Sequence, residues 1–192
     1  MSNVKKQTQK LALGALFTAL VIVLQVLGAF VRFGPFSISL VLVPIVIGSA
    51  VCGYKIGAWL GFVFGAAVLI SGDAAAFLAV DVLGTILTVL IKGTLCGLAA
   101  GLAYKAFSRV NTFLGVVSAA LVCPIVNTGI FLVGCFLFFM EPVTAWAAAL
   151  NFENVGSYMI FGLVGGNFLF ELGANIVLAP VIIRLIKLIR KS

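Results

Sequence analysis

Six apolar stretches alternate with short polar segments along the chain, and each has the length and composition of a helix in a membrane. They cover residues 11–30, 36–52, 56–71, 82–107, 113–140 and 157–183. A helix needs about 20 residues to cross a bilayer core, so the second and third stretches are short and are expected to be tilted or partly broken. The pattern predicts one all-α integral membrane domain over residues 1–192, with six transmembrane helices.

The charged residues between these stretches predict the orientation of the helices. With six spans, nearly all the basic residues outside the helices fall on one side, and the positive-inside rule makes that side cytoplasmic. Both termini are therefore predicted to be cytoplasmic. The other side carries the acidic residues, with Arg32 as its only basic residue. The acidic residues are Asp73, Asp81, Glu141 and Glu153.

The composition supports a membrane protein and explains the net charge. The mean hydropathy is +1.32, and only 9% of the residues are charged, too few for a water-exposed surface. The net charge of +7 follows from the basic cytoplasmic side, so it does not indicate a nucleic acid partner. The N-terminus resembles a signal peptide, but the apolar run over 11–31 is too long and lacks a cleavage site. It is predicted to be a retained helix.

Several kinds of chemistry are excluded by residue types. The chain has no histidine, which removes Ser-His and Cys-His catalysis and histidine metal ligation. No pair of intramembrane carboxylates suggests catalysis, and no Walker A motif suggests ATP hydrolysis. We predict a protein that is not an enzyme and has no cofactor or metal. The four cysteines are predicted to be packing residues; they are Cys52, Cys96, Cys123 and Cys135.

The last apolar stretch carries a polar face made of Asn167, Glu171 and Asn175. Their spacing of four places them on one side of a helix, one turn apart. A carboxylate at membrane depth costs several kcal/mol unless it faces a partner or a wet cavity. The alternative is that these residues only hold helices together through hydrogen bonds. We predict that this face lines a small-molecule site.

Two other helices supply polar groups at membrane depth. Asn127 follows Pro124 in the fifth stretch, where it either contacts a ligand or satisfies the backbone carbonyl that the proline leaves free. Lys92 lies inside the fourth stretch, and an ion pair with Glu171 is the simplest arrangement. If the pair forms, the site suits a neutral polar ligand. If it does not form, Glu171 is available to a cation.

The segments on the outer side add further candidates. Phe33 and Trp146 could close over a ligand, and Asn151 could donate to it or accept from it. Trp146 lies in an alanine-rich run that predicts a short interfacial helix, so a membrane anchor is its alternative role. The predicted ligand-binding residues are Asn127, Asn167, Glu171, Asn175, Lys92, Asn151, Phe33 and Trp146.

Small residues repeat every four positions in three of the predicted helices. Gly57, Gly61 and Gly65 form one such series in the third helix, and Gly93, Gly97 and Gly101 form another in the fourth. Such series let the backbones of two helices approach closely, so we predict internal packing for both. The first helix has Ala15 and Ala19 at the same spacing, which serve either internal packing or docking onto another membrane protein.

With its length, its six predicted spans and the first-helix segment Leu-Gly-Ala-Leu-Phe-Thr-Ala-Leu at residues 13–20, the chain resembles the S components of energy-coupling factor (ECF) transporters. The S component is the substrate-binding membrane subunit. The resemblance implies that Ala15 and Ala19 contact a transmembrane coupling subunit, and that two cytoplasmic ATPases drive uptake through a prokaryotic plasma membrane. It also implies a vitamin or related micronutrient, bound near the outer face by the first loop and the fourth to sixth helices.

The substrate has no signature in the sequence. Riboflavin is our first candidate, because a neutral aromatic ligand rich in hydrogen-bonding groups suits amides and aromatic rings. Pantothenate and folate are anions and fit the acidic outer loops less well, although Arg32 and Lys92 could serve them. Thiamine is a cation and would use Glu171 or Glu153. The alternative function is a self-sufficient secondary transporter or channel that uses Glu171 as its acid.

Overall fold

The computed structural model describes residues 3–30, 32–33, 36–37 and 40–191, and within this part the fold is helical apart from one small hairpin. The hairpin pairs two antiparallel strands of two residues each. The elements in chain order are α1 (Asn3–Phe30), β1 (Arg32–Phe33), β2 (Phe36–Ser37), α2 (Leu42–Cys52), α3 (Tyr54–Ile70), α4 (Ala75–Leu78), α5 (Val82–Phe107), α6 (Thr112–Phe138), α7 (Met140–Ala149), α8 (Val155–Ser157), the π-helix η1 (Tyr158–Gly165) and α9 (Gly166–Lys191).

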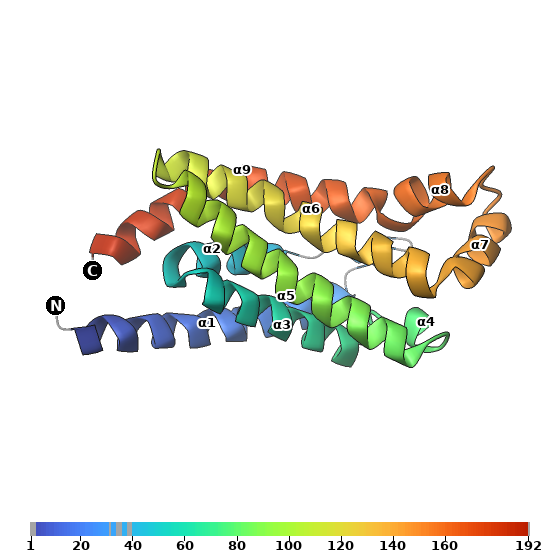
Figure 1. Cartoon of the computed structure of the whole chain (residues 1–192), viewed down its shortest axis with the longest axis horizontal. Coiled ribbons are helices and arrows are strands. Elements are labelled where there is room, and N and C mark those ends of the chain that lie inside the picture. The colour runs from blue at the N-terminus through green and yellow to red at the C-terminus, as the bar shows by residue number, and fades with distance from the viewer. Residues whose placement is uncertain (1–2, 31, 34–35, 38–39, 192) are drawn as a thin grey trace.

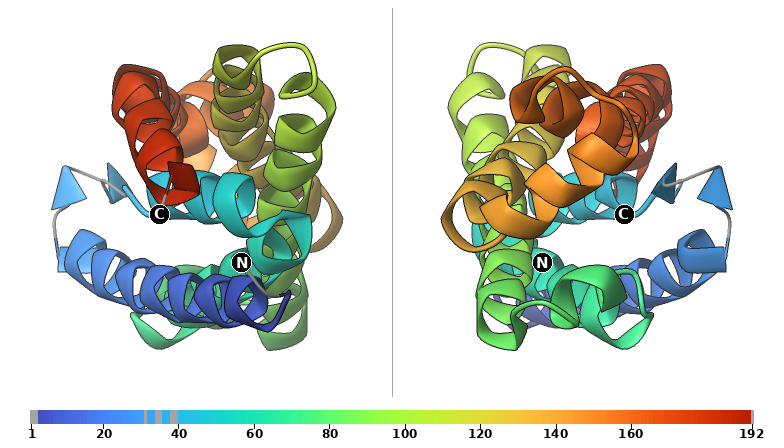
Figure 2. Two further views of the ribbon diagram at one scale, coloured as in Figure 1. Left: turned by 90° about the vertical axis from the view of Figure 1, so that its left-hand side faces the viewer. Right: turned by 90° about the vertical axis from the view of Figure 1, so that its right-hand side faces the viewer.

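The long helices run along one axis of an elongated bundle (Figure 1). The first residues of α1 and the last residues of α9 lie at the same end, and α4, α7 and α8 lie at the other. The short helix α2 occupies the interior, where it packs on α1, α3, α5, α6 and α9. Figure 2 shows α2 between α1 on one side and α6 with α9 on the other. Nine of its residues are buried, which explains why this helix is apolar on every side.

In the described part of the chain, four helices are long and apolar enough to cross a membrane, and they coincide with the first, fourth, fifth and sixth predicted stretches. Their apolar spans are Gln7–Ala29, Val82–Phe107, Thr112–Phe138 and Val155–Ile186. The helices of the second and third stretches, α2 and α3, are shorter, at 11 and 17 residues. The prediction that these two stretches are short for a transmembrane helix is therefore confirmed.

The second predicted helix, over 36–52, is wrong in its first part. Residues 36–37 form β2, and α2 begins only at Leu42. Pro44 therefore lies in the first turn of the helix and not in its middle. Proline is tolerated there, because the first N–H groups of a helix have no partner within it.

The fifth predicted stretch ends earlier in the structure than predicted, and the sixth begins earlier. The fifth ends at Phe138, and α7 follows directly at the end of the bundle where α4 lies. This is the short helix predicted around Trp146. The sixth span starts with α8, where the Asn154 side chain accepts a hydrogen bond of 2.7 Å from the Ser157 N–H. It continues as the π-helix η1, a wide turn that the sequence pattern did not predict and that is common at functional sites.

The predicted glycine packing is confirmed between α3 and α5. A methyl group on Gly57 would lie 2.5 Å from the carbonyl oxygen of Gly97, and one on Gly61 would overlap the carbonyl oxygen of Gly93. Gly101 packs against the backbone of Tyr54 in the same way. Only glycine allows these two backbones to touch, so the pairing of α3 with α5 depends on the repeat.

The first helix uses one side to pack and leaves another side open. Phe17, Val21 and Gln25 are buried against the bundle. Ala15 and Ala19 are exposed, so they take no part in packing within this chain. The four cysteines are buried and free, as expected for packing residues.

Candidate functional site

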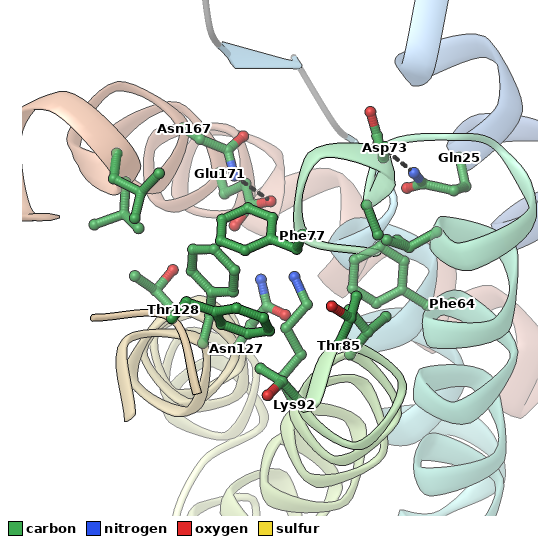
Figure 3. Close-up of a pocket in the computed structure, with 18 residues that line it drawn as sticks. Gln25, Phe64, Asp73, Phe77, Thr85, Lys92, Asn127, Thr128, Asn167 and Glu171 are labelled. Carbon is green, nitrogen blue, oxygen red and sulfur yellow. Dashed lines mark hydrogen bonds between the residues drawn. The ribbon is translucent and has the colours of Figure 1, made fainter. Parts of the chain in front are cut away.

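A cavity of about 180 Å³ lies inside the bundle, toward the end that carries α4 and α7. Its walls come from α1, α3, α4, α5, α6, η1 and α9, so residues far apart in sequence meet there. Figure 3 shows polar groups on opposite sides of the cavity, with aromatic rings between them. The labelled lining residues are Gln25, Phe64, Asp73, Phe77, Thr85, Lys92, Asn127, Thr128, Asn167 and Glu171.

The polar face of α9 reaches this cavity through Asn167 and Glu171. The Asn167 Nδ2 group donates a hydrogen bond of 3.2 Å to Glu171 Oε1. Glu171 is only 2% exposed, and its second oxygen, Oε2, has no hydrogen-bond partner in the described chain. Asn175 does not line the cavity. It lies one turn further along α9, where its Nδ2 group donates a 3.0 Å bond to the Glu171 carbonyl oxygen.

Asn127 lines the cavity from α6 and is 4% exposed. Its Oδ1 atom has no hydrogen-bond partner among the described residues. The sequence left open whether Asn127 repairs the backbone near Pro124 or contacts a ligand. An unpaired buried acceptor that faces a cavity favours the second role, because such an atom costs about 1–3 kcal/mol until a donor reaches it.

The sequence left open whether Lys92 pairs with Glu171, and these two described residues form no ion pair. The Lys92 Nζ atom instead lies 5.0 Å from the ring centroid of Phe131 and 5.8 Å from that of Phe64. These rings offer their negative faces to the ammonium group. Glu171 instead accepts the amide of Asn167 from its own helix. Both charges are therefore available to the cavity, which they both line.

Five polar lining residues were not predicted: Gln25, Asp73, Thr85, Thr88 and Thr128. Gln25 of α1 is 1% exposed, and its Nε2 group donates a 2.6 Å hydrogen bond to Asp73 Oδ2 in the segment between α3 and α4. A buried glutamine inside an apolar span was the available signal, because polar side chains at membrane depth seldom face lipid. Asp73 lies in a loop, and only the fold shows that this loop closes over the cavity.

Aromatic rings from α4, α6, α7 and the junction between α6 and α7 contact one another beside the cavity. Phe77 makes edge-to-face contacts with Phe131, Phe139 and Trp146, with ring centroids 5.4, 5.1 and 5.4 Å apart. Phe77, Phe131 and Phe139 line the cavity, whereas Trp146 lies behind Phe77. Trp146 therefore supports the wall of the cavity.

Of the two remaining predicted residues, Asn151 does not line the cavity. Asn151 is exposed in the connection between α7 and α8, where it adopts a positive φ of 57°. The side chain of Phe33 lies outside the described residues. The structure thus brings together Lys92, Asn127, Asn167 and Glu171.

Replacing Gln25 with methionine is expected to lower the free energy of unfolding by about 1.5–3 kcal/mol, the usual contribution of a hydrogen bond to a charged group. The variant removes the bond that ties α1 to Asp73. Thermal unfolding of the purified protein measures this, with Gln7→Met as the matched control, since Gln7 is exposed. Equal melting temperatures for the two variants would show that the bond does not contribute.

The chain is similar to a known protein family. A family model described as "ECF transporter, substrate-specific component" matches residues 9–183. The match covers α5 and α6 completely, most of α1 and α9, and every residue that lines the cavity. No curated protein and no solved structure matches the chain.

Proposed function

Because the chain belongs to the family of substrate-specific components of ECF transporters, we propose that the cavity of Figure 3 is its substrate site. The chain is then the binding subunit of an importer and has no catalytic role. One observation carries the assignment of the site: buried polar atoms on α6 and α9, without hydrogen-bond partners in the described chain, line the same cavity. An apolar pocket with a few convergent polar groups is the usual form of a small-molecule site.

The proposed ligand contacts are Lys92, Asn127, Asn167 and Glu171. Asn175 holds the backbone of Glu171, and Trp146 supports Phe77 from outside. Phe33 and Asn151 are proposed to reach the ligand only when the outer segments close over it.

The proposed topology has six crossings of the plasma membrane of a prokaryotic cell, in a single domain over residues 1–192. Two observations support it: α1 begins and α9 ends at one end of the bundle, and α2 with α3 forms an apolar pair between the longer helices (Figure 1). Both termini are proposed to be cytoplasmic by the distribution of basic residues.

The proposed partners are a transmembrane coupling subunit and two cytoplasmic ATPases. Ala15 and Ala19 on α1 are the proposed contact with the coupling subunit, because both are exposed and small residues let helices approach closely. Large apolar side chains flank them, with Leu16 55% and Leu20 40% exposed.

The proposed substrates are vitamins and related micronutrients, and riboflavin is the first compound to test. Its ring would lie among the aromatic side chains, and its polar groups would meet the amides of Asn127 and Asn167. Riboflavin is a neutral ligand, so Lys92 and Glu171 would act on it as hydrogen-bonding groups.

The test of this function separates binding from transport. We expect the purified chain alone to bind its ligand, and we expect uptake only when the coupling subunit, the ATPases and ATP are present. Reconstitution into liposomes with and without the partners measures both. Uptake by the isolated chain without ATP, at the rate of the full complex, would overturn the proposal.

A self-sufficient transporter or channel is the second candidate, favoured by the buried position of Glu171 beside the cavity. In that case Glu171→Gln should abolish the dependence of uptake on a proton gradient. If uptake depends on ATP and is independent of the gradient in both wild type and Glu171→Gln, the second candidate fails. Glu141→Gln is the matched control, because Glu141 is exposed on α7.

A further inference from the structure

Lys92 and Glu171 place two opposite charges in the cavity without neutralising each other by an ion pair. We propose that the ligand is a compact zwitterion, whose anionic group binds Lys92 and whose protonated nitrogen binds Glu171, Asn127 and Asn167. This inference rests on the proposed function, in which the cavity is the substrate site, and it names a class of substrate different from riboflavin. Figure 3 shows Lys92 rising from α5 on one side of the cavity and the carboxylate of Glu171 on the other.

The end of the cavity formed by α6 and α9 offers hydrogen-bond acceptors. Three buried atoms there have no hydrogen-bond partner in the described chain: Asn127 Oδ1, Asn167 Oδ1 and Glu171 Oε2. Amide oxygens and an ionised carboxylate accept hydrogen bonds and cannot donate them. A primary ammonium group carries three donors and one positive charge, so it satisfies three acceptors and compensates the carboxylate at the same time.

The wall formed by α5 carries the Lys92 ammonium group, together with the hydroxyl groups of Thr85 and Thr88. The contacts of the Lys92 ammonium group are with the rings of Phe64 and Phe131. An aromatic face attracts a cation by about 0.5–2 kcal/mol but accepts no strong hydrogen bond. A carboxylate or a similar anion on the ligand supplies the acceptor and the counter-charge that the rings do not.

The charge balance distinguishes a zwitterion from a simple anion or a simple cation. The ionisable lining residues in the described chain are Lys92, Glu171 and Asp73. Asp73 is half-buried in a loop and already accepts a bond from Gln25. A simple anion would leave Glu171 without a counter-charge, and a simple cation would leave Lys92 without one. Either case costs several kcal/mol at this depth.

The rest of the lining defines the body of the ligand. Phe77, Val68 and Val89 are apolar and line the same cavity as the two charged residues. The cavity volume of about 180 Å³ is below the range of roughly 300–1,000 Å³ for drug-sized ligands. The structure therefore favours a molecule of the size of an amino acid with an apolar side group over a fused three-ring molecule.

The inference is tested by incubating the purified full-length protein with a pool of small molecules of different charge. The pool contains the twenty common amino acids, riboflavin, pantothenate and thiamine at equal concentration. Bound compounds are recovered by gel filtration and identified by mass spectrometry. We expect retention of one or more net-neutral amino acids with an apolar side chain. Retention of riboflavin, pantothenate or thiamine instead would overturn this inference and leave the proposed function standing. Retention of nothing would count against both.

Analogues of the retained amino acid, combined with variants of Lys92 and Glu171, then show which residue binds each charged group of the ligand. For the retained amino acid, we expect the deaminated acid and the decarboxylated amine to bind wild-type protein about 100-fold more weakly, since each leaves one buried charge unpaired. In Glu171→Gln, the deaminated acid should bind almost as tightly as the amino acid, because the residue that pairs with the ammonium group is gone. In Lys92→Met, the decarboxylated amine should bind almost as tightly as the amino acid for the corresponding reason.

A control variant tests whether the effect is specific to the charges in the cavity. Lys105→Met should bind like wild type, because Lys105 is on the same helix, also lies over a ring, that of Tyr54 at 5.4 Å, and does not line the cavity. If a cavity variant does not fold, the affinities of wild-type protein for the amino acid, the deaminated acid and the decarboxylated amine still test whether both charged groups of the ligand are needed. Equal affinity of wild type for all three would overturn the inference.

Discussion

Replacing Gly61 with valine is expected to abolish the tight packing of α3 on α5 and to lower the melting temperature of the protein strongly. The new side chain would overlap the carbonyl oxygen of Gly93, and a backbone cannot move aside as a side chain can. We expect a loss of about 3 kcal/mol or more, equivalent to a fall of about 6–12 °C in a protein of this size.

The matched control for this prediction is Gly129→Val on α6. A side chain at Gly129 meets no atom within 4 Å, so the same substitution should leave the melting temperature close to that of wild type. Unfolding can be followed by a thiol-reactive dye, because the four cysteines are buried and free in the folded protein. Equal melting temperatures for Gly61→Val and Gly129→Val would contradict backbone contact as the basis of the packing.

Replacing Ala19 with tryptophan is expected to weaken binding to the coupling subunit by about tenfold or more, a loss of at least about 1.4 kcal/mol, while ligand binding stays unchanged. Ala19 is exposed on α1 and does not line the cavity. A large ring there keeps the two helices apart, and lipid provides no hydrophobic driving force to compensate. Co-purification with the partner subunits measures docking, and ligand binding to the isolated variant measures the site.

The control for docking is Val133→Trp on α6, where the valine is 57% exposed. It adds a ring to a different outer face of the bundle and should not change docking. A variant at Ala19 that loses ligand binding and docking together would show that this face of α1 stabilises the chain itself. Ala15→Trp is expected to behave like Ala19→Trp, because the two residues lie one turn apart.

The largest features of the fold follow from local sequence patterns. Long apolar runs predict the long helices, because only a helix satisfies its own backbone polar groups in lipid. The glycine repeats of the third and fourth stretches predict a close contact, and α3 and α5 make it. The first part of the stretch 36–52 was the main error, since an apolar composition does not distinguish a strand and turn from a short helix.

The candidate site was predicted in part. Asn127, Asn167 and Glu171 stood out because polar side chains at membrane depth are costly, and the structure places all three at one cavity. Two of the unpredicted polar contributors, Gln25 and Asp73, come from elements far apart in sequence. Their bond of 2.6 Å exists only because the segment after α3 lies beside α1.

The sequence by itself determined that this chain is a helical membrane protein and which of its residues are too polar to face lipid, because hydropathy and helical spacing are local properties. Tertiary structure decided how those residues combine. The sequence left open whether Lys92 and Glu171 form an ion pair. The packing of α5 against α3 and α6 places Lys92 beside Phe64 and Phe131, and Glu171 accepts a hydrogen bond from Asn167. The direction of a side chain across a cavity depends on the helices around it, and no pattern along one helix contains that information.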